Sequence, residues 1–257
     1  MPNDEIRDDV AAYERQVSDR ISALSAAAAA GELDPAVDIM ASAIERGGVI
    51  QAFGTGHSEA FAMEIAGRAG GLIPTNKIAL RDAALWGSHE LSELIGKPPL
   101  ERDPNIAADL LATVELHPED AFIIASNSGV NGSIVGLALL AKERGHRVIA
   151  VTSLEHTRAV EPKHPSGKRL SEVADVVIDN LAPYGDATLH DVLPVPVGAV
   201  SSITAAFIAQ LLTIGVSRRL STPEQVAPLY LSANIPGGDD HNNVLEARYG
   251  SRIKRGA

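Results

Sequence analysis

The chain has 257 residues, no cysteine and a formal net charge of −11. The acidic balance argues against nucleic acid or an anionic membrane as a partner, because such partners need a basic face. The lack of cysteine excludes disulfides, a thiolate nucleophile and a cysteine metal site. The charged segment from Met1 to Arg7 lacks the apolar stretch of a secretory signal, so a cytoplasmic location is expected.

Two amphipathic helices are predicted before the first strand. Apolar residues recur at three- and four-residue steps over residues 4–31, and a second helix follows Pro35 and stops at Gly47 and Gly48. We expect residues 1–47 to pack on the core or on a partner subunit. A core domain over residues 48–222 and a C-terminal tail over residues 223–257 would follow.

Short apolar runs alternate with helical patterns through the core domain. The strand candidates are residues 49–53, 72–74, 122–125, 147–152 and 174–179. This alternation predicts an α/β fold with a parallel, doubly wound sheet between layers of helices. In such sheets the ligand lies outside the carboxyl ends of the strands.

Two other segments leave alternatives open. Residues 75–103 form a polar, irregular stretch, which is either a loop that covers a substrate or a surface excursion anchored to the core by Trp86. Residues 192–216 carry no charge and are long enough to span a bilayer. Their prolines, glycines and hydroxyl residues favour a fully buried helix at a subunit interface over a membrane span.

Two Ser/Gly turns follow strand candidates and lead into helices. The first contains Gly56 and Ser58, and the second contains Ser126, Ser128 and Gly129. Backbone N–H groups, hydroxyls and the helix dipole at such a turn can hold an anion, so a phosphate would be bound without any lysine. The alternative is an ordinary helix cap, for which serine and asparagine are favoured in any case.

Cofactor fingerprints fit poorly. Gly54 and Gly56 have the first two spacings of a dinucleotide-binding loop, but the third position is Glu59 and no acidic residue ends the second strand candidate. No Gly-Lys-Ser/Thr triplet follows either turn, and no His-Glu-x-x-His spacing is present. We expect no cofactor and no metal.

The two turns together resemble those of the sugar isomerase (SIS) domain family of phosphosugar-binding proteins. The carrying patterns are Gly54-x-Gly56-x-Ser58 and Ser126-x-Ser128-Gly129-x-Asn131. The block GTGHSEAFAMEIAGRAGG and the tail LSANIPGGDDHNN are similar to the stand-alone SIS proteins of an uncharacterised family. The resemblance covers nearly the whole chain.

The resemblance implies a three-layer, flavodoxin-like fold with a five-stranded parallel sheet and an N-terminal helical extension. It also implies a homodimer or dimer of dimers whose subunits share the site. The implied phosphate-binding residues are Gly56, Ser58, Ser126, Asn127, Ser128, Gly129 and Asn131. The family commonly has threonine where this chain has Asn131, although an amide can still donate to a phosphate oxygen.

Acid and base candidates lie beside the turns. Glu64 stands seven residues beyond His57, so a regular helix would bring both near one face. Glu64 could instead pair with Arg68, and His57 could be a core histidine. Glu59 directly follows Ser58 and is a candidate substrate contact.

Two more histidines complete the set of candidates. Glu155 and His156 follow the strand candidate that ends at Thr152, where they could contact the substrate or cap the next helix. His241 lies in the polar tail, and SIS dimers often supply a histidine from the neighbouring subunit. A solvated tail is the alternative for His241.

The resemblance favours an N-acetylamino-sugar 6-phosphate, such as N-acetylglucosamine 6-phosphate, as the small-molecule substrate. Our hypothesis is proton abstraction at C2 by Glu64 or a neighbouring acid, with loss of the C3 hydroxyl as water. An aldose–ketose isomerase would share the first step. A sugar-phosphate sensor without turnover is the third possibility, since fold alone does not choose among them.

Overall fold

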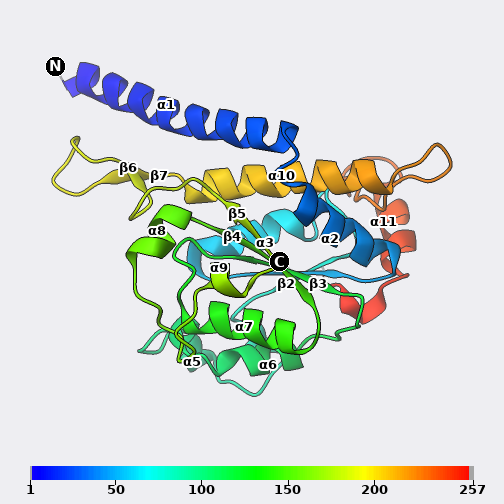
Figure 1. Cartoon of the computed structure of the whole chain (residues 1–257). Helices are drawn as coiled ribbons and strands as arrows, with labels where there is room; N and C mark the ends of the chain where they lie inside the picture. Colours follow the sequence, from blue (N-terminus) through cyan, green and yellow to red (C-terminus); the bar gives the residue numbers. More distant parts are fainter. Residues whose placement is uncertain (1, 255–257) are drawn as a thin grey trace.

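Five parallel strands in the order β2-β1-β3-β4-β5 form the centre of the structure, a computed structural model that describes residues 2–254 (Figure 1). The strands are β1 (Ile50–Gly54), β2 (Thr75–Ile78), β3 (Ala121–Ala125), β4 (Arg147–Thr152) and β5 (Val176–Asp179). Helices cover both faces, so the predicted three-layer, doubly wound α/β fold is confirmed.

Both faces of the central strands are apolar because both are covered. Every residue of β1 and β3 is buried, which explains why these strands are continuous apolar runs instead of alternating ones. Along β3, Ile123 belongs to one core cluster, whereas Phe122 and Ile124 belong to the other. The sheet therefore separates two hydrophobic cores.

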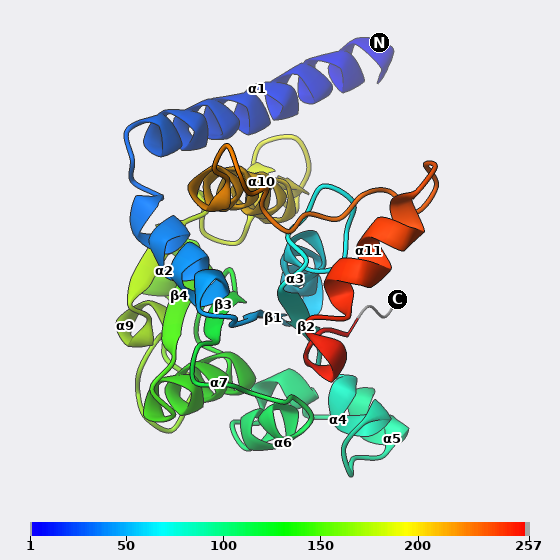
Figure 2. The same cartoon turned by 90° about the vertical axis from the view of Figure 1, so that its right-hand side faces the viewer.

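The helices that cover the sheet are α2 (Asp34–Glu45), α3 (Glu59–Ile65), α6 (Ile106–Ala112), α7 (Gly132–Glu143), α9 (Leu170–Val173) and α10 (Ser201–Leu220). The first core lies under α2, α3 and α10, and the second lies under α6, α7 and α9 (Figure 2). In the first, Met40 of α2 and Leu212 of α10 pack against the sheet; in the second, Leu110 of α6 and Leu137 of α7 do so.

The N-terminal helix α1 (Pro2–Ala29) lies on the side of α10 that faces away from the sheet (Figures 1 and 2). The Tyr13 hydroxyl donates to the Ala199 carbonyl over 2.6 Å, and the Arg20 guanidinium donates to the Leu181 carbonyl over 2.8 Å. Ala199 belongs to a two-stranded antiparallel ribbon made of β6 (Ala187–Leu189) and β7 (Val197–Ala199). This ribbon therefore helps to hold α1 in place.

The prediction of a fully buried helix over residues 192–216 is wrong in two respects. The segment begins as the end of the β6–β7 ribbon, and α10 itself exposes 40% of Ile203 and 58% of Ile214. Among residues 2–254, α10 is the one helix long and apolar enough to cross a membrane. It packs on α2 and α3, as a core helix does.

The irregular segment before α6 contains three short elements. They are α4 (Asp82–Leu85), α5 (Leu91–Leu94) and η2 (Leu100–Arg102). Trp86 is 66% exposed, so the alternative in which it anchors this segment to the core is wrong. The indole lies instead on the surface, with the Lys254 ammonium 5.6 Å from its ring centroid.

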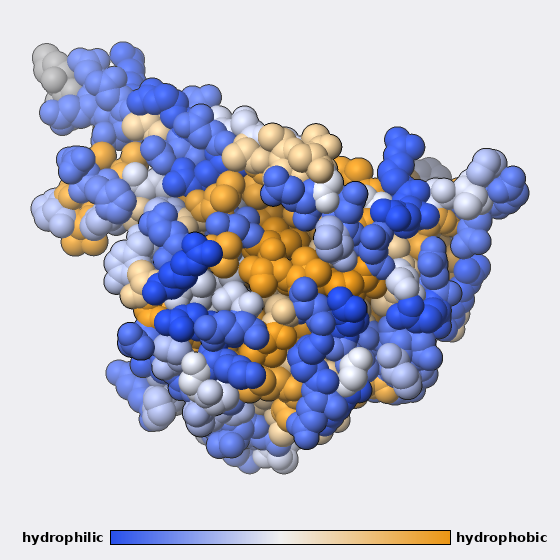
Figure 3. Space-filling view, in the orientation of Figure 1, coloured by the Kyte–Doolittle hydropathy of each residue, from blue (hydrophilic) through white to orange (hydrophobic). Residues whose placement is uncertain are grey.

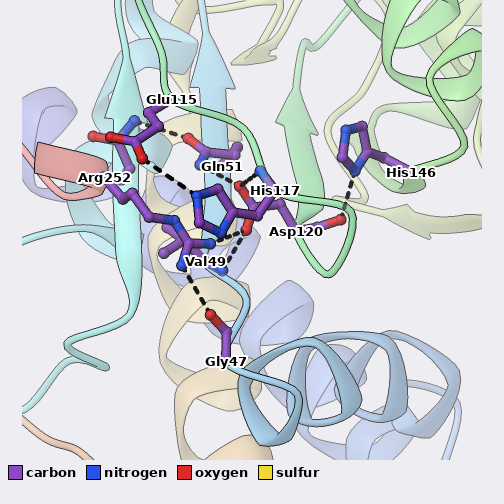
Figure 4. A network of polar contacts seen from close by, with 9 residues as sticks. Gly47, Val49, Gln51, Glu115, His117, Asp120, His146 and Arg252 are labelled. Atoms are coloured by element: carbon purple, nitrogen blue, oxygen red, sulfur yellow. Dashed lines mark hydrogen bonds and ion pairs between the residues drawn. The ribbon is translucent and has the colours of Figure 1, made fainter. Parts of the chain in front are cut away.

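The C-terminal segment closes the sheet at two places. Leu72 bridges Leu229, and the Ile73 N–H donates to the Pro228 carbonyl, so β2 begins only at Thr75 instead of at residue 72 as predicted. After α11 (Gly238–Glu246) and η3 (Gly250–Arg252), the Arg252 guanidinium reaches Asp120 and the Gly47 carbonyl (Figure 4).

Candidate functional site

The two Ser/Gly turns meet at the switch point of the sheet. β1 and β3 are hydrogen-bonded neighbours, with β2 beyond β1 and β4 beyond β3. In a sheet with this order, the connections leaving the two central strands diverge and open a crevice at their carboxyl ends. A pocket of about 560 Å³ lies there, within the usual range for a small-molecule site.

Both turns line this pocket, as the sequence analysis predicted from their position. The first turn contributes Gly56, His57 and Ser58. The second contributes Ser126, Asn127, Ser128 and Asn131. Beneath them, a small space floored by Phe61, Ala125 and Val151 shows that the pocket reaches down to the core.

The second turn is held in shape from within. The Ser126 hydroxyl accepts a hydrogen bond from the Gly129 N–H over 3.1 Å. Gly129 has a φ of 65°, and a Cβ there would lie 3.1 Å from the Thr152 hydroxyl, so glycine fits best. The Asn127 side-chain oxygen accepts from the Asn180 amide. Within residues 2–254, the Ser128 hydroxyl has no such partner and is available to a ligand.

The first turn is a single 3₁₀ turn, η1 (Gly56–Ser58), that precedes α3. A Cβ on Gly54 would lie 2.2 Å from the Ser58 carbonyl oxygen, so the backbone can turn this tightly only with glycine at that position. The 3₁₀ turn also means that His57 and Glu64 do not share one regular helix. His57 is exposed at the pocket, so the core-histidine alternative is wrong.

Several residues that line the pocket were not among the candidates predicted from the sequence. They are Glu101, Arg102, Lys163, Asp186, Ser201 and Ser202. Arg102 and Lys163 thus add two cations to the pocket lining, and the binding of a phosphate without any lysine stays a prediction. Arg102 ends η2 and Lys163 lies in an irregular segment, and no periodicity or motif marks their position.

Asp186 connects the pocket wall to α10. Its carboxylate accepts from the Val200 and Ser201 N–H groups and, over 2.7 Å, from the Ser201 hydroxyl. A carboxylate at a helix N-terminus satisfies unpaired N–H groups and the helix dipole. The start of this 20-residue helix is thereby fixed beside the second turn.

His156 also lines the pocket, and its ring is fixed by its neighbours. Its Nδ1 accepts a hydrogen bond from the Gly185 N–H over 3.1 Å, and the ring packs against Tyr184 with centroids 5.2 Å apart. Burial lowers the pKa of His156; Asp186 and Glu155 oppose this and the Lys163 charge adds to it. The imidazole is therefore held in its neutral form. The Ser153 hydroxyl, and not His156, caps α8 (Leu154–Ala159).

Five candidates do not line the pocket of this chain: Gly129 of the second turn, and four side chains with other partners. Glu59 pairs with Arg81 and Lys77, at 2.7 and 3.6 Å. Glu64 pairs with Arg68, as its alternative predicted, and accepts from the Gln210 amide over 3.0 Å. The Glu155 carboxylate accepts from the Tyr184 N–H, and His241 Nε2 lies 2.9 Å from the Leu229 carbonyl oxygen. Glu59 and Glu64 thus stand on α3 with partners of their own.

The described residues offer little for binding a metal ion. Across residues 2–254, no group of three or more His, Asp or Glu side chains is arranged to hold an ion. The pocket instead combines hydroxyls, backbone N–H groups and two cations. Such a set suits a phosphate or another oxyanion.

The chain belongs to the SIS domain family, since the family model matches residues 12–153. The fold and the two serine turns at its switch point agree with this assignment.

Within the family, the chain is similar to the UPF0309 proteins. It is 36% identical over 222 residues to the UPF0309 protein of Geobacillus sp. strain WCH70, covering 86% of this chain and 88% of that one. A Listeria monocytogenes UPF0309 protein is 36% identical over 225 residues, covering 87% of this chain and 90% of its own.

Solved structures share the fold at low sequence identity. Escherichia coli CFT073 c3406, in complex with a sugar phosphate, matches with a TM-score of 0.54 and 14% identity, covering 85% of this chain and 93% of that chain. The phosphoheptose isomerase GmhA of Neisseria gonorrhoeae matches with a TM-score of 0.51 and 17% identity, covering 82% and 98%.

Proposed function

We propose that this protein is a phosphosugar enzyme that acts on an N-acetylamino-sugar 6-phosphate and eliminates water after removing the proton at C2. The observation that carries the proposal is the convergence of two serine turns, two cations and several acid–base side chains on one pocket of about 560 Å³. The SIS family assignment and the fold neighbour bound to a sugar phosphate support a phosphosugar as the ligand.

The phosphate end of the ligand would lie against the two turns. Ser58 and Ser128 offer hydroxyl donors, and the N-terminus of the 12-residue helix α7 adds partial positive charge. Arg102 and Lys163 supply full charges to a dianionic group, which an overall acidic chain must provide locally.

The sugar would then extend toward His57, His156 and Glu101, which line the same pocket. In the proposed reaction the C2–H bond breaks and its electron pair forms a C2=C3 double bond as the C3–O bond breaks. The proton taken from C2 reaches the departing oxygen, which leaves as water, so the atoms balance without an oxidant or reductant.

A second copy of the chain is part of the proposal. The β6–β7 ribbon and α10 expose Leu193, Val195, Ile203 and Ile214, and Figure 3 shows apolar surface at the ribbon and across the middle of the same face. Exposed apolar patches of this kind mark protein contacts. A homodimer or dimer of dimers packed there would bring another chain close to Ser201 and Ser202, and a partner's His241 could complete the site.

Two alternative activities differ from the proposed dehydration in the products they would give. An aldose–ketose isomerase would remove the same proton and return it at C1. A sensor would bind the phosphosugar without turnover. The isomerase alternative has its own support, because the GmhA fold neighbour is a phosphoheptose isomerase.

Incubation with N-acetylglucosamine 6-phosphate in deuterated water, followed by NMR, separates these outcomes. We expect loss of the C3 oxygen. A ketose formed in a parallel incubation with glucose 6-phosphate, with deuterium at C1, would establish the isomerase instead, because that aldose has the C2 hydroxyl that becomes the carbonyl. Line broadening with no product would establish a sensor. Analytical ultracentrifugation of the same sample tests the dimer.

A further inference from the structure

The η2 segment, which has no sequence motif, lines the pocket beside the first turn. Its backbone is docked on the start of α7: the Ser133 hydroxyl donates to the Glu101 carbonyl over 2.7 Å. A Cβ on Gly132 would lie 2.3 Å from the Arg102 carbonyl oxygen, so only glycine allows this approach. The position of Glu101 is therefore set by a helix and not by a free loop.

The Glu101 carboxylate lies between the two turns. Its Oε1 accepts a hydrogen bond from the Asn131 amide over 3.3 Å. Its Oε2 would be 3.7 Å from a Cβ on Gly56, which places it against the first turn. The carboxylate is thus within reach of a ligand held by both turns.

Glu155, whose carboxylate accepts from the Tyr184 N–H, does not line the pocket, and three other carboxylates near the site have charged or multiple partners. Asp186 accepts three hydrogen bonds at the start of α10, and Glu64 and Glu59 pair with arginine or lysine. Among the described residues, the Glu101 carboxylate has only the neutral Asn131 amide as a hydrogen-bond partner. A single neutral donor orients the group, and within residues 2–254 the second oxygen has no hydrogen-bond partner.

We propose that Glu101 is the catalytic base of the reaction and that Asn131 is its positioning residue. The inference rests on the proposed function and assigns a role that the sequence analysis gave to Glu64. In the step, the C2–H bond of the sugar breaks and the proton moves to Glu101 Oε2. The carboxyl group then gives that proton to the C3 oxygen, which leaves as water, and the carboxylate is restored.

Glu101→Gln tests the base directly, because glutamine keeps the shape and cannot take a proton. With N-acetylglucosamine 6-phosphate we expect kcat to fall at least about 100-fold. The dissociation constant measured by calorimetry should change by less than about threefold. The matched control is Glu161→Gln, which removes the same charge at an exposed residue outside the pocket lining and should leave both values unchanged.

Asn131→Ala tests positioning. Loss of the amide donor removes the one hydrogen bond that orients the Glu101 carboxylate among residues 2–254, so the base is no longer held at one place. We expect kcat to fall about tenfold with KM little changed. A phosphate contact at Asn131 would instead raise KM and leave kcat unchanged, which would contradict the positioning role.

Each failure has its own signature. If the wild-type protein turns over the substrate and Glu101→Gln does so equally well, Glu101 is not the base. If that variant binds the substrate more tightly and turns it over normally, the carboxylate only competes with the phosphate, and the assignment is also wrong. A wild-type protein that binds the sugar phosphate without turnover refutes the proposed function itself.

Discussion

The guanidinium of Arg252 donates to the carboxylate of Asp120, which precedes it by 132 positions (Figure 4). The Asp120 side chain is fully buried, and the Arg252 side chain is 10% exposed. The same carboxylate accepts from the Val49 N–H at the entrance of β1. The C-terminal segment is thereby tied to the end of the sheet opposite the pocket.

Arg252→Ala should lower the free energy of unfolding by about 3–5 kcal/mol, because it leaves a buried carboxylate without its charge partner. Urea unfolding measures this. The control is Arg219→Ala, which breaks an ion pair with Asp38 whose side chains are 50% and 55% exposed. That change should cost less than about 1 kcal/mol. Equal effects of the two substitutions would contradict a stabilising role for the Arg252–Asp120 ion pair.

The serines of the second turn should separate by their partners. Ser128→Ala should weaken binding of inorganic phosphate about fivefold to tenfold and leave stability unchanged, because its hydroxyl is available to a ligand. Ser126→Ala should in addition cost about 1 kcal/mol of stability, since the Gly129 N–H loses its acceptor. Calorimetry and urea unfolding measure the two effects. Identical profiles for both variants would show that the turn is organised differently.

Glu64→Gln distinguishes the sequence-based hypothesis from the assignment of Glu101. Glu64 already binds Arg68 and Gln210, so we expect its loss to reduce stability by less than about 1 kcal/mol. Turnover of N-acetylglucosamine 6-phosphate should stay within about twofold. A large loss of kcat in this variant, with substrate binding intact, would return the catalytic role to Glu64.

His89 should make stability depend on pH. Its ring nitrogens each lie 2.8 Å from a carboxylate oxygen, of Asp109 and of Glu93, and these two carboxylates raise the pKa of His89 above its ordinary value of 6.5. A raised folded pKa gives stability that is fully present below pH 6.5 and lost as the pH rises through the folded pKa. His89→Gln removes this contribution.

The difference in unfolding free energy between wild type and His89→Gln should therefore be larger at about pH 6 than at about pH 9. His190→Gln, at an exposed position, is the control and should show no such pH dependence. A difference that is constant across this range would mean that the histidine is not charged in the folded protein.

The sequence predicted the sheet and the location of the site because both depend on local patterns. β4 was predicted at residues 147–152 and lies there, since its apolar run is bounded by a charge and a polar turn. Ser58 and Ser128 follow strands that are adjacent in the sheet, so the same patterns brought them together. The rules for connecting strands allow only a few strand orders in a doubly wound sheet, which limits where the two turns can lie.

The rest of the site depends on contacts between distant segments. Lys163 and Glu101 lie in stretches without periodicity. Contacts near the start of α7 hold both segments, because the Lys163 N–H donates to the Val130 carbonyl and the Ser133 hydroxyl donates to the Glu101 carbonyl. Glu64 was favoured because a regular helix was assumed from His57 onward, whereas the chain makes a 3₁₀ turn first. The apolar residues from Leu72 onward predict the start of a strand. In the structure Leu72 pairs with Leu229 of the C-terminal segment, and the sheet strand begins only at Thr75.

The hydrogen bond from the Gly185 N–H to His156 Nδ1 decides which tautomer the imidazole adopts. With Nδ1 occupied as an acceptor, the neutral ring carries its proton on Nε2. His156 can then offer a hydrogen bond to an oxygen of the sugar but has no lone pair left to take a proton from carbon. One backbone amide thus determines that His156 can act at the pocket as a hydrogen-bond donor and not as a base.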